Sequence, residues 1–143
     1  MRAKVLIMGL PGAGKTTLAT ALAPLIGAVV FNADAVRANL SLDLGFSHAD
    51  RISHARRMGW LCDCVGAAGY PAIADFVCPT EETRMAFGIA FTIWIDRIKI
   101  GRFEDTNKMF IPPMHFDLRV RGDNSPSYWA EQAQRQITGI KWA

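Results

Sequence analysis

The residues best suited to chemistry form the stretch GLPGAGKTT, residues 9–17, which follows the apolar run VLIM. The stretch fits the pattern G-x-x-x-x-G-K-[ST], with Gly9, Gly14, Lys15 and Thr16 in the fixed positions. In such a P-loop the backbone N–H groups turn inward around phosphates, the lysine reaches the outer phosphates and the hydroxyl binds Mg²⁺. The helix expected after the loop adds its positive N-terminus. The pattern therefore predicts a site for a nucleoside triphosphate.

The whole loop is predicted to bind the phosphates of ATP. Lys15 is predicted to be catalytic and Thr16 to bind the metal, so ATP and Mg²⁺ are the expected cofactors. The alternative is a glycine-rich turn that serves packing alone, but packing does not require all the fixed positions in this context. The predicted phosphate-binding residues are Gly9, Leu10, Pro11, Gly12, Ala13, Gly14, Lys15, Thr16 and Thr17.

The elements that must position this loop alternate along the chain. Apolar runs predict strands at residues 3–9, 28–31, 70–76 and 89–96. Helical periodicity and capping signals, among them Ser47, predict helices at residues 15–26, 47–68, 79–88 and 125–137. This alternation favours an α/β fold, a doubly wound parallel sheet with helices on both faces, as in P-loop NTPases and kinases. We expect a single domain over residues 1–143, with ligands at the carboxyl ends of the strands.

The composition limits the class of protein. Of the 143 residues 50% are hydrophobic, but no apolar run approaches the roughly 20 residues of a membrane span, and no signal-peptide pattern is recognised. We therefore expect a soluble, cytoplasmic protein with no membrane partner. The formal net charge of +3 agrees with anionic ligands such as nucleotides without requiring nucleic acid. Cys62, Cys64 and Cys78 lack the partners of a zinc site and are expected to be buried or free thiols.

Acidic residues follow the predicted strands. Asp34 comes after the second strand, Asp75 ends the third and Asp96 ends the fourth. A Mg²⁺-dependent phosphoryl transfer needs a carboxylate near the metal or the attacking hydroxyl, and Asp34 and Asp75 are predicted to supply it. The simpler alternatives are that Asp34 is only the N-cap of a helix at residues 35–40 and that Asp75 is a structural acid. Asp96 is expected to be a solvated or capping residue.

Beyond the loop, the chain resembles the adenylyl-sulfate kinases. Their corresponding stretch runs through D-G-D-N-V-R, L-N-x-D-L-G-F-S, D-R and R-R, and here it reads NADAVRANLSLDLGFSHADRISHARRMG. The segment DFVCPTEETR resembles their S-F-I-S-P segment, and RFEDTNKMFIPP is compatible with their G-F-T-G-I segment and following Pro pair. The resemblance covers roughly residues 3–120 and is strongest over residues 9–57.

This resemblance implies an ATP-dependent kinase that moves the γ-phosphoryl group to a hydroxyl of a small nucleotide-like acceptor. The 3′-hydroxyl of adenylyl sulfate is the preferred acceptor. Asp34 matches the family's acid that serves the metal and the acceptor hydroxyl, and Arg37 matches an arginine that holds the acceptor; both are predicted to be catalytic. The other acceptor-binding residues that the match implies are Phe46, Arg51, His54, Val77, Cys78, Pro79 and Phe103.

These assignments agree with simple chemistry, and each has a plainer alternative. An aromatic face suits any base, and a guanidinium suits sulfate or phosphate oxygens. The alternative for Arg37 and Arg51 is a solvated helix face. The alternative for Phe46 and Phe103 is packing.

The sequence also departs from the family. Asn32 stands where the family has the first Asp of D-G-D, so one metal-side carboxylate is missing, and Asp75 is the candidate to compensate. His54 replaces a substrate-contacting Asn, although a neutral imidazole still forms hydrogen bonds. Only residues 97–101 remain where the family has a much longer basic lid, which predicts a more open site or a larger acceptor. The local cations that remain are Arg97, Lys99, Arg102 and Lys108.

Two other functions stay open at this point. A viral-type kinase of hydroxymethylpyrimidines in DNA fits the truncated lid, with DNA as its partner, although the chain has no long basic stripe. A nucleotide-binding module without transfer activity fits the loss of the lid and the asparagine at position 32. The sequence does not indicate an oligomeric state.

Overall fold

The fold is an alternating series of strands and helices, seen in a computed structural model that describes residues 1–101 and 103–142. Arg102, one of the local cations named above, lies outside the described residues. The elements are β1 (Lys4–Met8), α1 (Lys15–Ile26), β2 (Val29–Asn32), α2 (Ala33–Leu40), α3 (His48–Ala67), β3 (Ala72–Asp75), α4 (Glu81–Phe87), β4 (Phe91–Ile95), α5 (Glu104–Met109), β5 (Leu118–Val120) and α6 (Pro126–Thr138).

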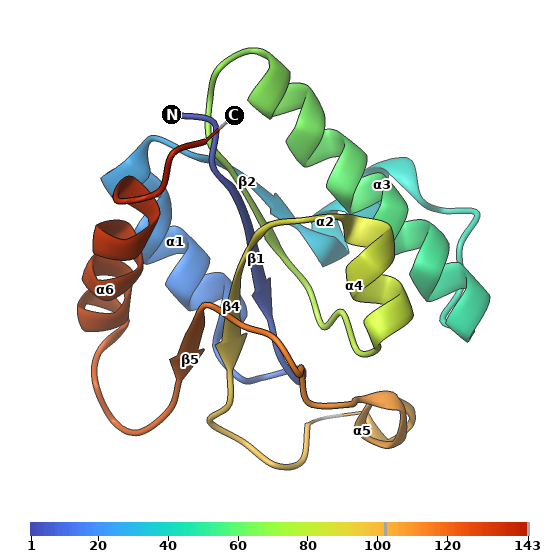
Figure 1. Cartoon of the computed structure of the whole chain (residues 1–143). Coiled ribbons are helices and arrows are strands. Elements are labelled where there is room, and N and C mark those ends of the chain that lie inside the picture. The colour runs from blue at the N-terminus through green and yellow to red at the C-terminus, as the bar shows by residue number, and fades with distance from the viewer. Residues whose placement is uncertain (102, 143) are drawn as a thin grey trace.

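The strands form one parallel sheet in the order β2-β3-β1-β4-β5, with β1 at its centre (Figure 1). Every adjacent pair is parallel, so all the strands end at the same edge of the sheet. The register places Asp75 of β3 opposite both Ile7 of β1 and Asn32 of β2. The P-loop and the polar residues at the ends of β2 and β3 are therefore neighbours.

Helices cover both faces of the sheet, because the side chains of each strand alternate between two cores. Val5 and Ile7 of β1 belong to the core under α1 and α6, whereas Leu6 and Met8 belong to the core under α2, α3 and α4. Figure 1 shows α1 and α6 together on one side and α3 and α4 on the other. The predicted α/β fold, a doubly wound parallel sheet, is confirmed.

The two ends of the chain lie close together, at the edge of the sheet opposite the P-loop (Figure 1). Met1, Arg2 and Trp142 border the same shallow hollow. No helix in the described part of the chain is both long enough and apolar enough to cross a membrane.

The structure corrects the sequence predictions at three places. Neither α5 nor β5 was predicted. Asp96 is not a solvated residue, because its side chain is 8% exposed and accepts a hydrogen bond from Arg119 Nε at 3.0 Å.

The predicted cap of α3 is confirmed, since Ser47 Oγ accepts from the Asp50 N–H at 3.1 Å. The three cysteines are free, and burial raises the pKa of Cys62 and of Cys78 to about 12, which leaves both as unreactive thiols.

Candidate active site

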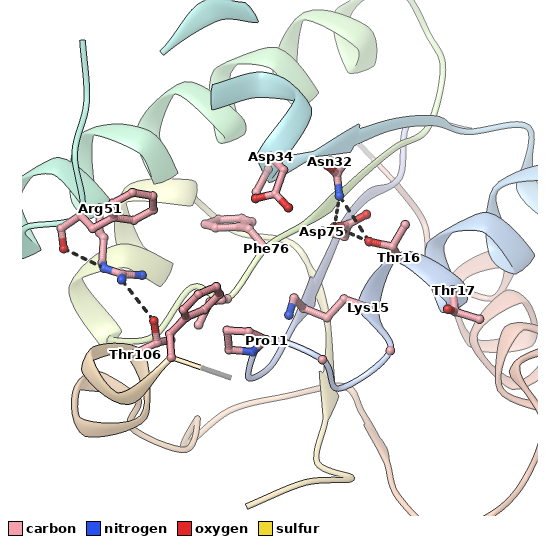
Figure 2. Close-up of a pocket in the computed structure, with 16 residues that line it drawn as sticks. Pro11, Lys15, Thr16, Thr17, Asn32, Asp34, Arg51, Asp75, Phe76 and Thr106 are labelled. Atoms are coloured by element: carbon pink, nitrogen blue, oxygen red, sulfur yellow. Dashed lines mark hydrogen bonds between the residues drawn. The ribbon is translucent and has the colours of Figure 1, made fainter. Parts of the chain in front are cut away.

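A cavity of about 780 Å³ opens at the carboxyl ends of the strands (Figure 2). The P-loop and the start of α1 form one wall, and the residues that follow β2 and β3 form another. The acceptor-side wall comes from the loops around α3 and α5, with Phe46, Arg51, Phe103 and Thr106. Elements that are distant in the sequence thus meet in one concave site, as expected for a parallel sheet of this kind.

Two glycines let the P-loop turn where it does. Gly9 has φ +152°, and a Cβ there would lie 2.7 Å from the carbonyl oxygen of Ile95 in β4. Gly14 has φ +105° and directly precedes α1. A side chain at either position would strain the backbone, so the glycines of the motif serve its shape. The loop and the N-terminus of α1 border the cavity together.

Lys15 lies in this cavity and curves back over the loop. Its Nζ donates to the carbonyl oxygen of Leu10 at 2.9 Å. Lys15, Thr16 and Thr17 all line the cavity, together with Pro11, Gly12 and Gly14. Six of the nine predicted phosphate-binding residues therefore face the same space. Gly9, Leu10 and Ala13 do not line it, and Leu10 and Ala13 are buried beneath the loop.

A hydrogen-bonded cluster of Thr16, Asn32 and Asp75 lies beside the lysine (Figure 2). Asn32 Nδ2 donates to Asp75 Oδ1 at 3.0 Å and to Thr16 Oγ1 at 3.3 Å, and Thr16 Oγ1 lies 3.4 Å from Asp75 Oδ1. Asp75 is only 2% exposed, and its Oδ2 atom is buried without a hydrogen-bond partner. Burial raises the pKa of Asp75 to about 6, against the opposing effects of Asn32, Lys15 and Thr16.

These residues fit a magnesium ion. Mg²⁺ prefers oxygen ligands and is usually held by one or two carboxylates together with substrate phosphates and water. The unpartnered Oδ2 of Asp75 is a buried acceptor of the required type, and such an atom destabilises a protein unless a ligand pairs with it. No cluster of three or more His, Cys, Asp or Glu side chains suited to a metal occurs among the described residues. A cation here would therefore take most of its ligands from the nucleotide and from water.

Asp34 lines the same cavity from the first turn of α2. It is not the helix cap, so that alternative is wrong: Asn32 is the N-cap, and its Oδ1 accepts from the Ala35 N–H at 3.0 Å. The helix begins at Ala33, two residues earlier than the alternative required. The exposed Asp34 carboxylate faces the cavity across from Lys15 (Figure 2).

Two arginines hold Phe46 at the acceptor side. The guanidinium carbon of Arg37 lies 4.4 Å from the centre of the Phe46 ring, and that of Arg51 lies 5.5 Å from it. Each arginine also donates to a backbone carbonyl of the same loop, Arg37 to Gly45 at 2.9 Å and Arg51 to Phe46 at 3.1 Å. These contacts contradict the alternative that both arginines lie on a solvated helix face.

The two aromatic residues predicted to bind the acceptor are exposed. Phe46 is 66% exposed and Phe103 is 59% exposed, and both line the large cavity. Neither side chain is part of either hydrophobic core. The alternative that Phe46 serves core packing is therefore wrong, and both side chains are exposed to a ligand in the cavity.

The remaining acceptor residues gather around a smaller cavity of about 50 Å³. Arg51, Phe76 and Val77 line both cavities, so the two adjoin. The other lining residues of the smaller cavity are Arg37, His54, Cys78 and Pro79. The structure thus brings all the predicted acceptor residues together, but divides them between two connected spaces.

His54 places a buried imidazole in the wall of the smaller cavity. The side chain is 3% exposed, and neither ring nitrogen has a hydrogen-bond partner within the described structure. Burial, together with the positive charges of Arg37, Arg57 and Arg51, lowers the pKa of His54 to about 4. The imidazole is therefore neutral at physiological pH and offers one donor and one acceptor.

The short segment after β4 supplies part of the cavity wall. Gly101 lies against the P-loop, where an added Cβ would come within 3.0 Å of Pro11 Cδ. Asn107 holds this approach, since its Oδ1 accepts from the Gly101 N–H at 2.7 Å and its Nδ2 donates to the Gly101 carbonyl at 3.1 Å. On the other side, Arg51 Nη2 donates to Thr106 Oγ1 at 3.3 Å. The segment spans from the P-loop to the start of α3.

Two of these residues are missing from the predictions made from the sequence. Thr106 lies on the unpredicted α5, and Phe76 was not singled out although it stands inside the DFVCP segment.

Of the local cations, Lys99 pairs with Asp96 and Lys108 with Glu104. Arg97 lies nearer the loop, because a Cβ on Gly14 would be 3.7 Å from Arg97 Nη1.

A central strand, a glycine loop closing on a helix, and acids at the neighbouring strand ends define a P-loop kinase. The sequence model of the family described as "Adenylylsulphate kinase" matches residues 1–92. The chain belongs to the adenylylsulphate kinase family. The family predicted from the sequence is confirmed.

Individual relatives agree with this assignment. The chain is 30% identical over 143 residues to an adenylyl-sulfate kinase of Chloroflexus aurantiacus, an alignment that covers 80% of this chain and 77% of the relative. It is 35% identical over 85 residues to a probable adenylyl-sulfate kinase of Aeropyrum pernix, covering 56% of this chain and 46% of that protein. These relatives support the prediction of an ATP-dependent kinase and give the alternative functions no support.

The fold extends beyond the part matched in sequence. The structure of the Mycobacterium tuberculosis APS kinase in complex with AMPPNP and APS superposes with a TM-score of 0.84 at 23% identity, over 96% of this chain and 98% of that one. The likeness in fold therefore includes the residues after 92, where the family's sequence model no longer matches.

Proposed function

We propose that this protein transfers the γ-phosphoryl group of ATP to the 3′-hydroxyl of adenylyl sulfate, with Mg²⁺ as cofactor, in the cytoplasm. The observation that carries the proposal is that Lys15, Asp34 and Phe46 line one cavity. A phosphate-holding cation, an exposed carboxylate and an accessible aromatic face are the three parts that such a transfer needs.

The phosphate end of the site belongs to ATP. The amides of the loop and the N-terminus of α1 attract the phosphate oxygens, and Lys15 neutralises charge that develops on the transferred group. Thr16 and Asp75 would hold Mg²⁺, and Asp34, which lines the same cavity, would share in that role. The ion, when bound, neutralises negative charge on the phosphates.

Asp34 is the residue that serves the acceptor hydroxyl. Its carboxylate stands in the cavity between the phosphate loop and the aromatic wall. From there it accepts a hydrogen bond from the hydroxyl, orients the oxygen toward the γ-phosphorus and takes up the proton as the new bond forms.

The acceptor would use both connected cavities. Its base lies against the faces of Phe46 and Phe103, because stacking on aromatic rings suits a purine. Its phosphosulfate end points toward the smaller cavity, where Arg37 and Arg51 supply positive charge and His54 supplies a neutral hydrogen bond. The small size of that cavity favours a compact anion over a polymer backbone.

The test is an acceptor screen with the purified protein, labelled ATP and Mg²⁺. We expect label to move to adenylyl sulfate and not to AMP, which lacks the sulfate, or to DNA that contains 5-hydroxymethyluracil. Lys15→Ala should lower turnover by at least about a thousandfold, because the main cation on the phosphates is lost. Lys141→Ala, an exposed lysine near the C-terminus, is the matched control and should behave as the unaltered protein.

Two results would contradict the proposal. Transfer to the modified DNA but not to adenylyl sulfate would identify a nucleic-acid kinase. A rise in melting temperature with ATP, without label on any acceptor, would identify a binding module instead.

A further inference from the structure

The side chain of Asn32 forms hydrogen bonds to Thr16, Ala35 and Asp75 at the phosphate end of the cavity. We propose that Asn32 is a positioning residue for the divalent cation, because its amide orients the Asp75 carboxylate so that Oδ2 is left for the metal. This inference rests on the Mg²⁺-dependent function proposed above and assigns a role to a residue outside the P-loop. It concerns the chain's own hydrogen bonds and not the transfer step.

The carboxamide of Asn32 uses both of its ends. Its Oδ1 accepts from the Ala35 N–H at 3.0 Å and so caps α2, while its Nδ2 donates to Asp75 Oδ1 at 3.0 Å and to Thr16 Oγ1 at 3.3 Å. An amide carries an acceptor and two donors on one planar group, which no carboxylate or hydroxyl of this length provides. One side chain thereby ties together β2, β3 and the start of α1.

The partner acid is placed by the sheet itself. The register puts Asn32 directly opposite Asp75 in the neighbouring strand, so the two side chains meet at the ends of their strands. A second carboxylate at position 32 would bring an oxygen to about the place of Nδ2, some 3 Å from Asp75 Oδ1. Two carboxylates that close cannot both remain ionised without a cation between them. The asparagine thus permits a single buried acid at this edge.

The free oxygen of that acid points to a ligand. Asp75 is 2% exposed, and its Oδ2 is buried with no hydrogen-bond partner, while Oδ1 is within reach of both Asn32 and Thr16. A buried carboxylate oxygen without a partner is strongly destabilising unless something positive binds to it. A divalent cation bound to Oδ2 meets that need, and rotation of the Asp75 carboxylate would remove the site.

The experiment measures the affinity for ADP by calorimetry, once with Mg²⁺ and once with EDTA. The ratio of the two dissociation constants is the metal effect. Asn32→Ser keeps a good capping oxygen for α2 but loses the amide donor to Asp75. Asp75→Asn is isosteric and removes the carboxylate. Asn39→Ala is the matched control, because Asn39 is an exposed asparagine of α2 whose Nδ2 donates to the Ala35 carbonyl at 2.8 Å.

We expect Asp75→Asn to remove most of the metal effect and Asn32→Ser to reduce it roughly tenfold, the value of a hydrogen bond to a charged group. Affinity for ADP in EDTA should stay within about twofold in both variants, since neither residue holds the phosphates directly. The double variant should match Asp75→Asn alone, because Asn32 acts through Asp75. Asn39→Ala should leave the metal effect unchanged.

Other outcomes would overturn the inference. An Asn32→Ser protein with the full metal effect, or additive losses in the double variant, would show that Asn32 does not act through Asp75. An Asn32→Ala protein that loses only melting temperature would show a helix cap and nothing more. These results differ from failure of the proposed function, in which the unaltered protein would bind ADP no better with Mg²⁺ than with EDTA.

Discussion

The two halves of the cavity are built in different ways. The phosphate half uses backbone turns and short side chains at the ends of central strands, with Thr16, Asn32 and Asp75 held by the register of the sheet. The acceptor half uses long side chains from loops, such as Arg51, and a six-residue helix, α5. The comparison teaches that geometry fixed by the sheet leaves little freedom, whereas a wall held by side-chain bridges can change with the ligand.

The match to the family includes the phosphate half and part of the acceptor half, with Phe46 and Arg51. The family's sequence model covers residues 1–92, which include the P-loop, Asn32 and Asp75 and end within β4. The segment after β4 contributes Phe103 and Thr106 to the cavity and lies beyond that match. Because the register of the sheet fixes the phosphate half, substitutions there should harm folding and every reaction, whereas substitutions in the acceptor half should act mainly on the acceptor.

The largest effect is expected at the tightest point of the phosphate half. Gly9→Ala should lower the free energy of unfolding by roughly 3 kcal/mol or more, because the new Cβ would meet the Ile95 carbonyl and the backbone has positive φ. Gly27→Ala is the matched control: it also has positive φ, +67°, but nothing lies within 4 Å of its Cβ position. It should lose only about 1 kcal/mol. Urea denaturation measures both, and equal losses would contradict the close approach.

A pH effect is expected from the small cavity. The pKa of His54 is lowered to about 4 in the folded protein, so between that value and its ordinary 6.5 the unfolded chain binds a proton that the folded one excludes. Stability should therefore fall as the pH drops from 6.5 to 4, by up to about 3 kcal/mol. His54→Asn should lack this loss.

Comparing the pH dependence of stability of the unaltered protein with that of His54→Asn separates the contribution of the histidine from that of other groups. Asp75, whose pKa is raised to about 6, works in the opposite direction, since its folded form binds the extra proton and gains stability as the pH falls below 6. That contribution is the same in both proteins, so the difference between their stability curves reports His54 alone. Curves that run parallel from pH 7 to 4 would show that His54 is not held neutral by the fold.

A smaller effect is expected at Arg51, whose hydrogen bonds join the Phe46 loop to Thr106 of α5 within the acceptor half. Arg51→Lys should raise the KM for adenylyl sulfate roughly ten- to a hundredfold, because an ammonium cannot reach both the Phe46 carbonyl and Thr106 as the guanidinium does. The KM for ATP should not change. Arg57→Lys, on the same helix but paired with Asp43, is the control. A rise in both KM values would mean that the acceptor wall also shapes the phosphate half.

The smallest effect is expected in the segment after β4. Asn107→Ala removes both hydrogen bonds to Gly101 and should raise the acceptor KM by roughly threefold to tenfold, with about 1 kcal/mol lost in stability. Asn124→Ala, at an exposed asparagine before α6, should change neither. Steady-state kinetics with adenylyl sulfate measure the effect. An unchanged KM would show that the contact between Gly101 and Pro11 does not depend on Asn107.

Much of the phosphate half could be predicted from the sequence, because its signals are local. A fixed motif gives the P-loop, apolar runs give the central strands, and Ser47 marks the start of α3. The choice between Asn32 and Asp34 as the cap of α2 could not be made locally, since both are good capping residues. The neighbouring strand decides it, by placing Asp75 opposite Asn32.

The chain after β4 was harder to predict, because tertiary contacts create its elements. Strand β5 has only three residues, too few for a pattern, yet its Arg119 is what buries and pairs Asp96. Helix α5 lies in a polar stretch and is held from outside by Arg51 and by the bond from the Ile111 N–H to the Pro79 carbonyl at 2.8 Å. Spacing along the chain also could not show that the acceptor residues divide between two cavities.

The meeting of the two chain ends, opposite the P-loop, has a practical consequence. Since Met1, Arg2 and Trp142 border one hollow, a short glycine-rich linker can join residues 1 and 142, and new ends can be opened in an exposed loop elsewhere. Such a circular permutant keeps every strand in its place. Affinity tags, fluorophores or a fused second enzyme attached beside Met1 or Trp142 would likewise lie away from the entrance to the cavity.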